Sequence, residues 1–236
     1  MRFGIFTKRN DVRLPYILER FRSKGVEIAL IVIAESKVIK LSLKGKIAKL
    51  IRRKNEFNVS NYIKEFNHVY VKDHNSNDTM RCLYENEIDF VFLSSAGILK
   101  PSVINGNWKI INCHPAILPR YRGKGSPIWA IYEEGSTGVT AHLVDSGIDT
   151  GPIIHREYVN PLPDETIHNF RKRLDFVSID VMCLIAKKII DRVGIYTEIQ
   201  KPEEGVLYRR KPLNSELPYI IKVFERTKIK RKNNGH

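Results

Sequence analysis

The apolar positions near the start of the chain follow the spacings of strands and helices in alternation. Residues 2–6 and 26–33 are short, nearly continuous apolar runs, which are typical of strands buried in a parallel sheet. Between them, residues 11–22 place four apolar side chains on one face of a helix: Leu14, Ile17, Leu18 and Phe21. A strand, a helix and a second strand within about thirty residues predict a βαβ unit.

Similar signals continue as far as residue 189. Further strands are expected at residues 69–71, 89–93, 108–112, 139–144 and 152–159. Helices are expected at residues 77–87, from residue 126, and at residues 167–189. In the last of these, apolar residues recur every three or four positions for about six turns. The pattern predicts an α/β fold with a mostly parallel sheet flanked by helices.

Residues 195–236 carry a different pattern, without a helical period. They contain four residues that interrupt helices: Pro202, Gly205, Pro212 and Pro218. We therefore expect a short β-rich C-terminal tail in this part of the chain. Gly194 ends the preceding helix. The predicted organisation is thus a main domain over residues 1–194 and a short C-terminal extension over residues 195–236.

The composition is that of a protein with one substantial core. The 236 residues are 42% hydrophobic and 28% charged, which suits one well-packed soluble domain with a small appendage. No run reaches the roughly 18 apolar residues that a membrane span needs, and residues 1–6 are too short and strand-like for a secretory signal. The cysteines are scattered and lack the spacing of metal ligands: Cys82, Cys113 and Cys183. We therefore expect a cytoplasmic protein with reduced cysteines and no bound metal.

The chain carries a formal net charge of +14, concentrated in two clusters. Nucleic acid, anionic lipid and small polyanionic substrates are the partners that such a charge favours. One cluster, residues 37–54, has an apolar stripe flanked by lysines, the pattern of a helix that lies on an anionic membrane surface or on a partner. A helix that simply packs on the sheet is the alternative. For the second cluster, residues 222–232, the alternative is a solvated tail.

Three polar residues between positions 112 and 149 are candidates for catalysis. Asn112 ends a predicted strand, and His114 follows two residues later. In open α/β sheets, ligands bind at the carboxyl ends of the strands. Asp149 lies in a loop bounded by Gly147 and Gly151. Each residue also has a structural explanation, because an Asn often bonds the backbone of a turn, a histidine can be buried in the core and an Asp can shape a loop.

These residues belong to a longer ordered string: Asn112, His114, Pro115, Leu118, Pro119, Arg122, Gly123, Gly138, Thr140, Asp149 and Gly151. The string resembles that of the 10-formyltetrahydrofolate-dependent formyltransferases, which include glycinamide ribonucleotide transformylase, methionyl-tRNA formyltransferase and the sugar N-formyltransferases. The resemblance is close over residues 85–160 and holds only in outline for the N-terminal third. It implies a Rossmann-like fold, a formyltransferase catalytic domain in residues 1–194 and 10-formyltetrahydrofolate as cosubstrate.

The resemblance assigns catalysis to Asn112, His114 and Asp149. Transfer of a formyl group to an amine passes through a tetrahedral oxyanion, which an Asn amide can stabilise without exchanging protons. A protonated His114 can add a charge-assisted hydrogen bond, about twice as strong as a neutral one. A carboxylate such as Asp149 can orient the imidazole or relay the proton that the attacking amine loses. His142 either supports these residues from behind or packs in the core.

The same resemblance implies further site residues. Backbone groups of four residues would contact the pterin: Ala96, Gly97, Ile98 and Leu99. The loop of residues 145–151 would close over it, through Asp145, Gly147 and Ile148. Four cations are candidates for binding anionic groups of the acceptor: Arg9, Arg120, Arg122 and Lys124.

The chain lacks features that two members of this family use to bind their acceptors, and this narrows the choice of acceptor. Glycinamide ribonucleotide transformylase cradles its substrate phosphate with a glycine-rich loop after the first strand, whereas residues 7–11 here contain no glycine. Methionyl-tRNA formyltransferase has a C-terminal barrel domain, for which residues 195–236 are too few. Elimination favours a small-molecule amine, namely the amino group of a nucleotide-linked amino sugar, and we expect no dedicated nucleic-acid domain.

Two alternatives stay open. One is a formyltransferase that acts on glycinamide ribonucleotide or another small amine. The other is a basic RNA-binding protein with a relic formyltransferase fold, although residues 37–54 lack the interleaved aromatic residues that stack on bases. The sequence leaves the sugar, the nucleotide and the oligomeric state open, with a homodimer among the alternatives.

Overall fold

The computed structural model describes residues 1–35 and 58–233. They belong to two compact units, Met1–Trp108 and Lys109–His236. The basic segment at residues 37–54 lies outside the described residues, so its interpretation as an interfacial helix stays a prediction. In the part of the chain that the structure describes, no helix has the length and hydropathy needed to cross a membrane.

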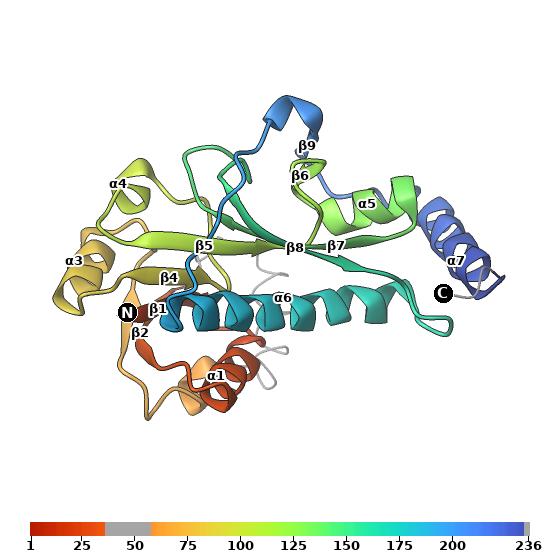
Figure 1. Ribbon diagram of the computed structural model, residues 1–236. Coiled ribbons are helices and arrows are strands. Elements are labelled where there is room, and N and C mark those ends of the chain that lie inside the picture. The colour runs from red at the N-terminus through yellow and green to blue at the C-terminus, as the bar shows by residue number, and fades with distance from the viewer. Residues whose placement is uncertain (36–57, 234–236) are drawn as a thin grey trace, which may run out of the picture. The chain divides into compact units, whose positions relative to one another are not determined.

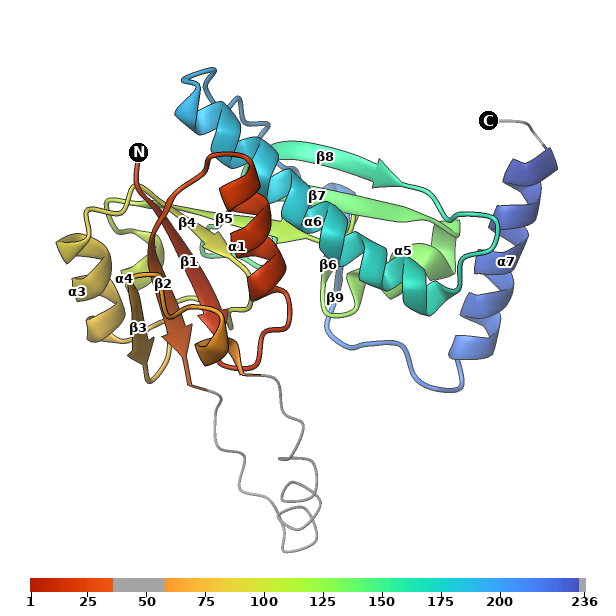
Figure 2. The same cartoon turned by 90° about the horizontal axis from the view of Figure 1, so that it is seen from below.

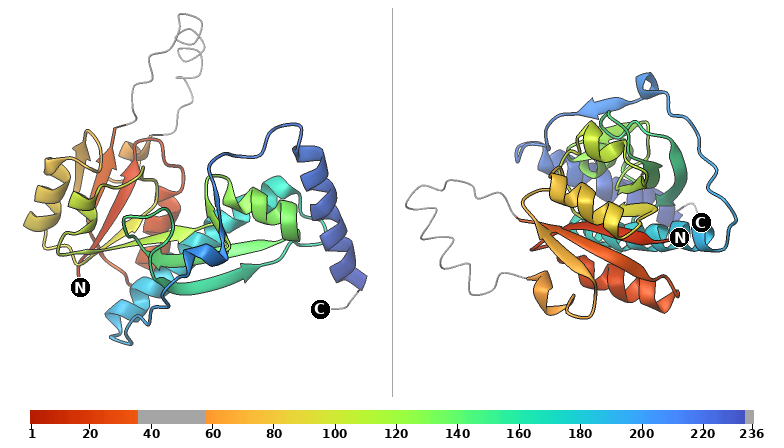
Figure 3. Two further views of the ribbon diagram at one scale, coloured as in Figure 1. Left: turned by 90° about the horizontal axis from the view of Figure 1, so that it is seen from above. Right: turned by 90° about the vertical axis from the view of Figure 1, so that its left-hand side faces the viewer.

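The N-terminal unit is built on four parallel strands in the order β3-β2-β1-β4. The strands are β1 (Phe3–Lys8), β2 (Ile28–Ala34), β3 (His68–Val71) and β4 (Phe90–Leu93). The helices of this unit are α1 (Leu14–Ser23), the short turn η2 (Val59–Asn61), α3 (Asn77–Glu85) and α4 (Pro101–Ile104). α1 and α3 lie on opposite faces of the strands (Figure 3). This follows from right-handed crossovers, since the connection through α1 steps one way across the sheet and that through α3 steps back.

The core of this unit matches the apolar pattern of the sequence. All four residues predicted to share one face of α1 are buried. Phe21 on that face is fully buried and meets the ring of Phe92 on β4 edge-on, with the ring centroids 5.5 Å apart. The βαβ prediction for the first thirty or so residues is therefore confirmed by β1, α1 and β2.

The C-terminal unit contains three antiparallel strands in the order β5-β7-β8. These are β5 (Lys109–His114), β7 (Thr137–Leu143) and β8 (Ile153–Val159). Two three-residue strands, β6 (Tyr121–Gly123) and β9 (Val206–Tyr208), form a separate parallel pair. The helices are α5 (Ser126–Glu134), α6 (Ile167–Ile190), the short turn η3 (Pro202–Glu204) and α7 (Leu217–Asn233). α6 covers one face of the antiparallel strands and α5 lies over the other (Figure 1).

The predicted α/β fold is confirmed, and parallel pairing joins β1–β2, β1–β4, β2–β3 and β6–β9. The expectation of a β-rich tail needs correction. β9 is its only named strand among the described residues, and its largest element is α7, which packs on α5 (Figure 2). Pro218 occupies the first turn of α7, where proline is tolerated because its nitrogen needs no helical partner there. Ile220 and Phe224, four residues apart, are fully buried on one side of this helix.

Candidate active site

Two of the predicted catalytic residues come from one strand. Asn112 and His114 are two positions apart at the end of β5, so both side chains leave the same face. Asn112 is half-buried, whereas His114 is 4% exposed. Asp149 lies in the loop between β7 and β8, with a φ of 54° that is uncommon for a residue with a side chain. The structure brings all three into one cluster within the C-terminal unit.

Both ring nitrogens of His114 face protein acceptors. Nε2 donates to the Tyr121 carbonyl oxygen at 2.8 Å, which requires a hydrogen on Nε2 because a carbonyl oxygen can only accept. Nδ1 lies 3.4 Å from Oδ2 of Asp149, in ion-pair range. The backbone N–H of Gly123 donates to the same Oδ2 at 2.9 Å. An imidazolium at His114 would have an acceptor for each of its two N–H groups.

His142 on β7 joins the cluster from the next strand and is 2% exposed. Its Nδ1 donates to the Leu143 carbonyl oxygen at 2.8 Å, while Nε2 lies 3.2 Å from Nδ2 of Asn112 and 3.7 Å from Oδ1 of Asp149. Burial lowers the pKa of His142 below its ordinary value, and the charge of His114 lowers it further, against the opposing effect of Asp149. A neutral His142 therefore accepts a hydrogen bond from the Asn112 amide and fixes which way that amide points.

The loop that carries Asp149 is held by side chains on both sides. Within the loop, Oδ1 of Asp145 accepts from the Gly147 backbone N–H at 3.1 Å and from the Thr150 hydroxyl at 2.7 Å. From outside the loop, Nε2 of Gln200 donates to the carbonyl oxygens of Asp149 and Gly151. Gln200 was not predicted, because a single glutamine far from the matched string carries no signal of its own.

The predicted folate-binding residues fall in both units. Ala96, Gly97, Ile98 and Leu99 follow β4 in the N-terminal unit, whereas Asp145, Gly147 and Ile148 belong to the loop of Asp149. Asn75 holds the first segment on both sides, because its Nδ2 donates to the Ile98 carbonyl oxygen at 3.1 Å and its Oδ1 accepts from the Lys100 N–H at 2.6 Å. Ile98 itself is 81% exposed.

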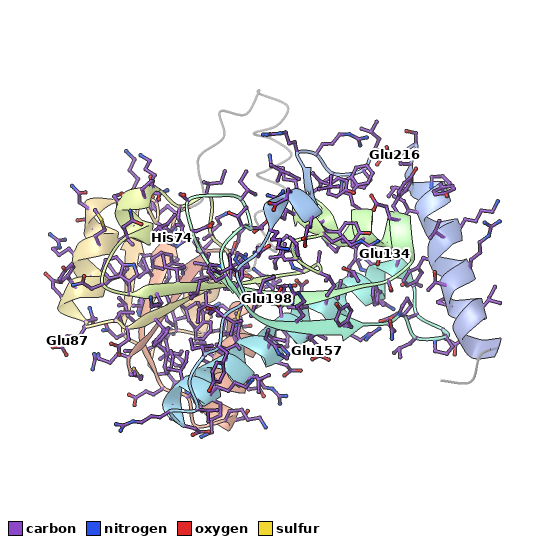
Figure 4. All side chains as sticks on the ribbon, turned by 45° about the horizontal axis from the view of Figure 1, so that its top comes forward. His74, Glu87, Glu134, Glu157, Glu198 and Glu216 are labelled. Atoms are coloured by element: carbon purple, nitrogen blue, oxygen red, sulfur yellow. The ribbon has the colours of Figure 1, made fainter. Side chains whose placement is uncertain are left out.

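The predicted acceptor-binding cations are also divided between the units. Arg120, Arg122 and Lys124 lie on or beside β6, and Arg120 is paired with Glu134 at 2.8 Å. Glu134 ends α5 (Figure 4). Arg9 follows β1 in the N-terminal unit, where its guanidinium group lies 5.1 Å from the centre of the Tyr70 ring.

A buried carboxylate near Arg9 was not predicted. Asp11 is 7% exposed and lies just before α1. Its Oδ2 accepts from the hydroxyls of Ser94 at 2.5 Å and Thr7 at 3.1 Å, and its Oδ1 accepts from the backbone N–H and Nε of Arg13. Four donors thus hold a negative charge at the amino end of α1, the place where a helix otherwise attracts an anion.

Known proteins match this chain in sequence and in fold. The formyl transferase family model matches residues 5–185. The methionyl-tRNA formyltransferase of Parvibaculum lavamentivorans is 33% identical over 129 residues, which is 53% of this chain and 41% of that protein. The matched segment therefore spans less than half the length of that relative.

Two solved structures share the fold. A phosphoribosylglycinamide formyltransferase from Bacillus halodurans has a TM-score of 0.60 at 22% identity, covering 82% of this chain and 97% of its own. An N-formyltransferase from Helicobacter canadensis has a TM-score of 0.63 at 16% identity, covering 95% of this chain and 81% of its own. Because the family model matches most of the sequence, the chain belongs to the formyl transferase family.

Proposed function

We propose that the protein is an N-formyltransferase that moves a formyl group from 10-formyltetrahydrofolate to the amino group of a nucleotide-linked amino sugar. The observation that carries this proposal is the joined cluster of Asn112, His142, Asp149 and His114 in one compact unit. An amide donor, a histidine placed between two acceptors and a carboxylate are groups that suit attack by an amine on a formyl carbon.

Asn112 supports the proposal through its second amide hydrogen. Its Nδ2 carries two hydrogens, and one of them is directed at His142. The other is available to the formyl oxygen, on which negative charge grows as the amine nitrogen bonds to the formyl carbon. Loss of one such donor costs other enzymes about 3–4 kcal/mol of barrier.

His114 and Asp149 have complementary roles in this mechanism. Because both nitrogens of His114 already face protein acceptors, we assign it the role of holding the Asp149 carboxylate in place rather than offering a free N–H to the oxyanion. The amine must lose one proton, and the departing folate nitrogen must gain one. The Asp149 side chain is 17% exposed, so a water molecule can reach its carboxylate and relay that proton.

The residues predicted to hold the folate suit a flat, partly apolar ligand. Ile98 is 81% exposed and Ile148 is 41% exposed, which leaves both aliphatic side chains free to contact a ring. The folate supplies the formyl group, and the backbone of residues 96–99 and of the 145–151 loop would bind the pterin. The Helicobacter canadensis enzyme of the same fold was solved with folinic acid and dTDP-3-aminofucose. That pair of ligands supports a folate donor and an amino-sugar acceptor here.

The buried carboxylate of Asp11 argues against glycinamide ribonucleotide as acceptor. In the transformylase that uses it, backbone amides after the first strand bind the phosphate. Here the corresponding loop holds a carboxylate that already accepts from Thr7, Ser94 and Arg13. A phosphate at this position would meet a like charge in a poorly solvated place.

A second candidate acceptor is the amino group of methionyl-tRNA. It is favoured by the 33% identity to a methionyl-tRNA formyltransferase and by the net charge of +14, which suits a polyanion. Both candidates use the same cluster, so they differ in what the protein binds and not in the chemistry.

An acceptor panel tests the proposal. We would incubate the protein and 10-formyltetrahydrofolate with nucleotide-linked amino sugars, glycinamide ribonucleotide or charged initiator tRNA, and identify the products by mass spectrometry. We expect a formylated amino sugar, a requirement for the folate and no effect of a chelator. Turnover confined to glycinamide ribonucleotide or tRNA would refute the sugar as acceptor but would leave the assignment of formyltransferase activity intact. No formylated product from any acceptor would refute both.

A further inference from the structure

The segment after α6 returns to the active site and pairs with its backbone. Glu198 and Ile153 exchange two backbone hydrogen bonds, each 2.8 Å long, at the start of β8. Glu198 lies beside the strands of the C-terminal unit in Figure 4. Its side chain also makes a two-pronged ion pair with Arg156 on β8. Residue 198 is thereby fixed beside Ile153, where the loop that carries Asp149 ends.

Gln200 reaches from this segment into the loop. Its side chain is 6% exposed, and its Nε2 donates to the carbonyl oxygen of Asp149 at 3.2 Å and to that of Gly151 at 2.5 Å. Carbonyl oxygens only accept, so only the NH2 end of this amide can serve both. The Oε1 atom is buried and has no hydrogen-bond partner among the described residues. The contact therefore depends on the donor end of the side chain.

The same segment also supports the other side of the site. At β9, the Val206 N–H donates to the Arg120 carbonyl oxygen at 3.0 Å, and the Tyr208 carbonyl oxygen accepts from the Lys124 N–H at 2.8 Å. β6, held between these bonds, supplies the Tyr121 carbonyl to His114 and the Gly123 N–H to Asp149. The approach is close, since a Cβ on Gly205 would lie 1.7 Å from the Pro119 carbonyl oxygen. We call residues 198–208 the C-terminal strap.

We propose that Gln200 is a positioning residue which holds the Asp149 carboxylate beside His114, and that the C-terminal strap is part of the active site. Asp149 adopts a left-handed backbone conformation, which persists only where the surrounding structure fixes it. Gln200 bonds the backbone on both sides of Thr150 and so fixes that conformation. The expected effect on kcat rests on the proposed formyl transfer, whereas the expected effect on the Asp149 loop does not.

Two variants and one control test this inference. Gln200→Met keeps the length of the side chain and removes both hydrogen bonds. Gln200→Glu keeps the shape but places carboxylate oxygens against two carbonyl oxygens, which it can only repel when ionised. The control is Lys187→Gln on α6, which lies outside the strap and removes an exposed ion pair with Asp191. If Gln200→Met fails to fold, Gln200→Glu carries both readouts.

The first readout is hydrogen–deuterium exchange, which needs no substrate. We expect faster exchange of the backbone amides of residues 145–151 in both Gln200 variants and wild-type exchange there in Lys187→Gln. Unchanged exchange of this loop in both Gln200 variants would overturn the inference. This readout stands even if no acceptor is ever formylated, so failure of the strap and failure of the proposed function can be told apart.

The second readout is a double-mutant cycle on kcat, measured with whichever acceptor the wild-type protein formylates. We expect Gln200→Met to lower kcat by up to about 100-fold, as small misplacements of catalytic groups do, with less than a twofold change in KM. In an Asp149→Asn background the same substitution should have almost no further effect, because Gln200 acts through Asp149. The inference would be contradicted if the two substitutions lowered kcat independently, so that their fold-losses multiply in the double mutant. A change in KM alone would also contradict it.

Discussion

Two histidines lie against the same carboxylate and meet opposite partners. His114 faces the Tyr121 carbonyl and Asp149, both of which accept hydrogen bonds. His142 faces one carbonyl oxygen and the N–H group of Asn112, an arrangement that only a neutral ring can satisfy. His114 therefore lies between two acceptors, whereas His142 offers a lone pair to the Asn112 amide.

Removal of the Asn112 amide should affect the rate far more than the fold. Asn112→Ala deletes the donor we assign to the oxyanion, and we expect kcat to fall by about two to three orders of magnitude. The loss would be measured as steady-state formylation, with thermal unfolding as a check on the fold. Asn107→Ala is a matched control, because it removes an exposed amide that bonds only Tyr84 among the described contacts. A near-wild-type rate in Asn112→Ala would contradict the mechanism.

Protonation of His142 should reduce activity at acidic pH. Its pKa lies below the ordinary 6.5, so the ring is neutral at pH 7 and gains a proton only at lower pH. The added N–H would then oppose the Asn112 amide and turn it. His142→Gln keeps an acceptor that cannot titrate in this range, so the ratio of its rate to the wild-type rate should rise as the pH falls below about 6.5. A ratio constant between pH 5 and 8 would show that His142 does not act in this way.

At the scale of elements, α7 is the part of the C-terminal unit whose attachment is easiest to measure. Phe224 on α7 is fully buried and lies 5.4 Å, centre to centre, from the Phe170 ring of α6. We expect Phe224→Ala to lower the free energy of unfolding by about 3–5 kcal/mol, since it leaves a cavity. Ile229→Ala on the same helix removes a 59% exposed side chain and should cost less than about 0.5 kcal/mol. Equal effects in urea unfolding would show that α7 is not anchored by this contact.

β1 and β2 contribute a pH-dependent part of the stability through His74. Its ring stacks on Phe6 of β1 and its Nε2 donates to the Val32 carbonyl oxygen of β2. Burial lowers the pKa of His74 below 6.5, so the unfolded chain binds this proton more readily than the folded one. The free energy of unfolding should therefore fall as the pH drops below about 6.5. His74→Gln should remove part of that slope, whereas His168→Gln, at an exposed position, should keep it.

Helices and strands could be predicted where a single spacing of apolar residues dominates the segment. α1 and α6 follow from apolar residues three and four positions apart, and the buried strands follow from short apolar runs. The antiparallel direction of β7 and β8 could not be seen, since the residue pattern of a single strand does not fix the direction of the strand that it pairs with. α7 was missed because Pro218 was treated as an interruption, although it lies in a first turn.

In the molecule as a whole, the residues that we propose for catalysis lie within the C-terminal unit, while the predicted folate and acceptor residues are divided between both units. The matched string identified Asn112, His114 and Asp149 because their order and spacing are visible along the chain. Gln200 and Asp11 were not visible, since each acts through partners distant in sequence or through backbone atoms. Such contacts depend on the folded arrangement and leave no local pattern.

The most direct test of the account follows an isotopically labelled formyl carbon from 10-formyltetrahydrofolate to the amine of a nucleotide-linked amino sugar. NMR of the products would be recorded for the wild-type protein, for Asn112→Ala and for the control Asn107→Ala. We expect the label to appear as a formamide with the wild-type protein and with Asn107→Ala. We expect Asn112→Ala to slow its appearance by about two orders of magnitude or more. A label that stays on the folate or is released as formate with the wild-type protein, or that moves equally fast with Asn112→Ala, would contradict the account.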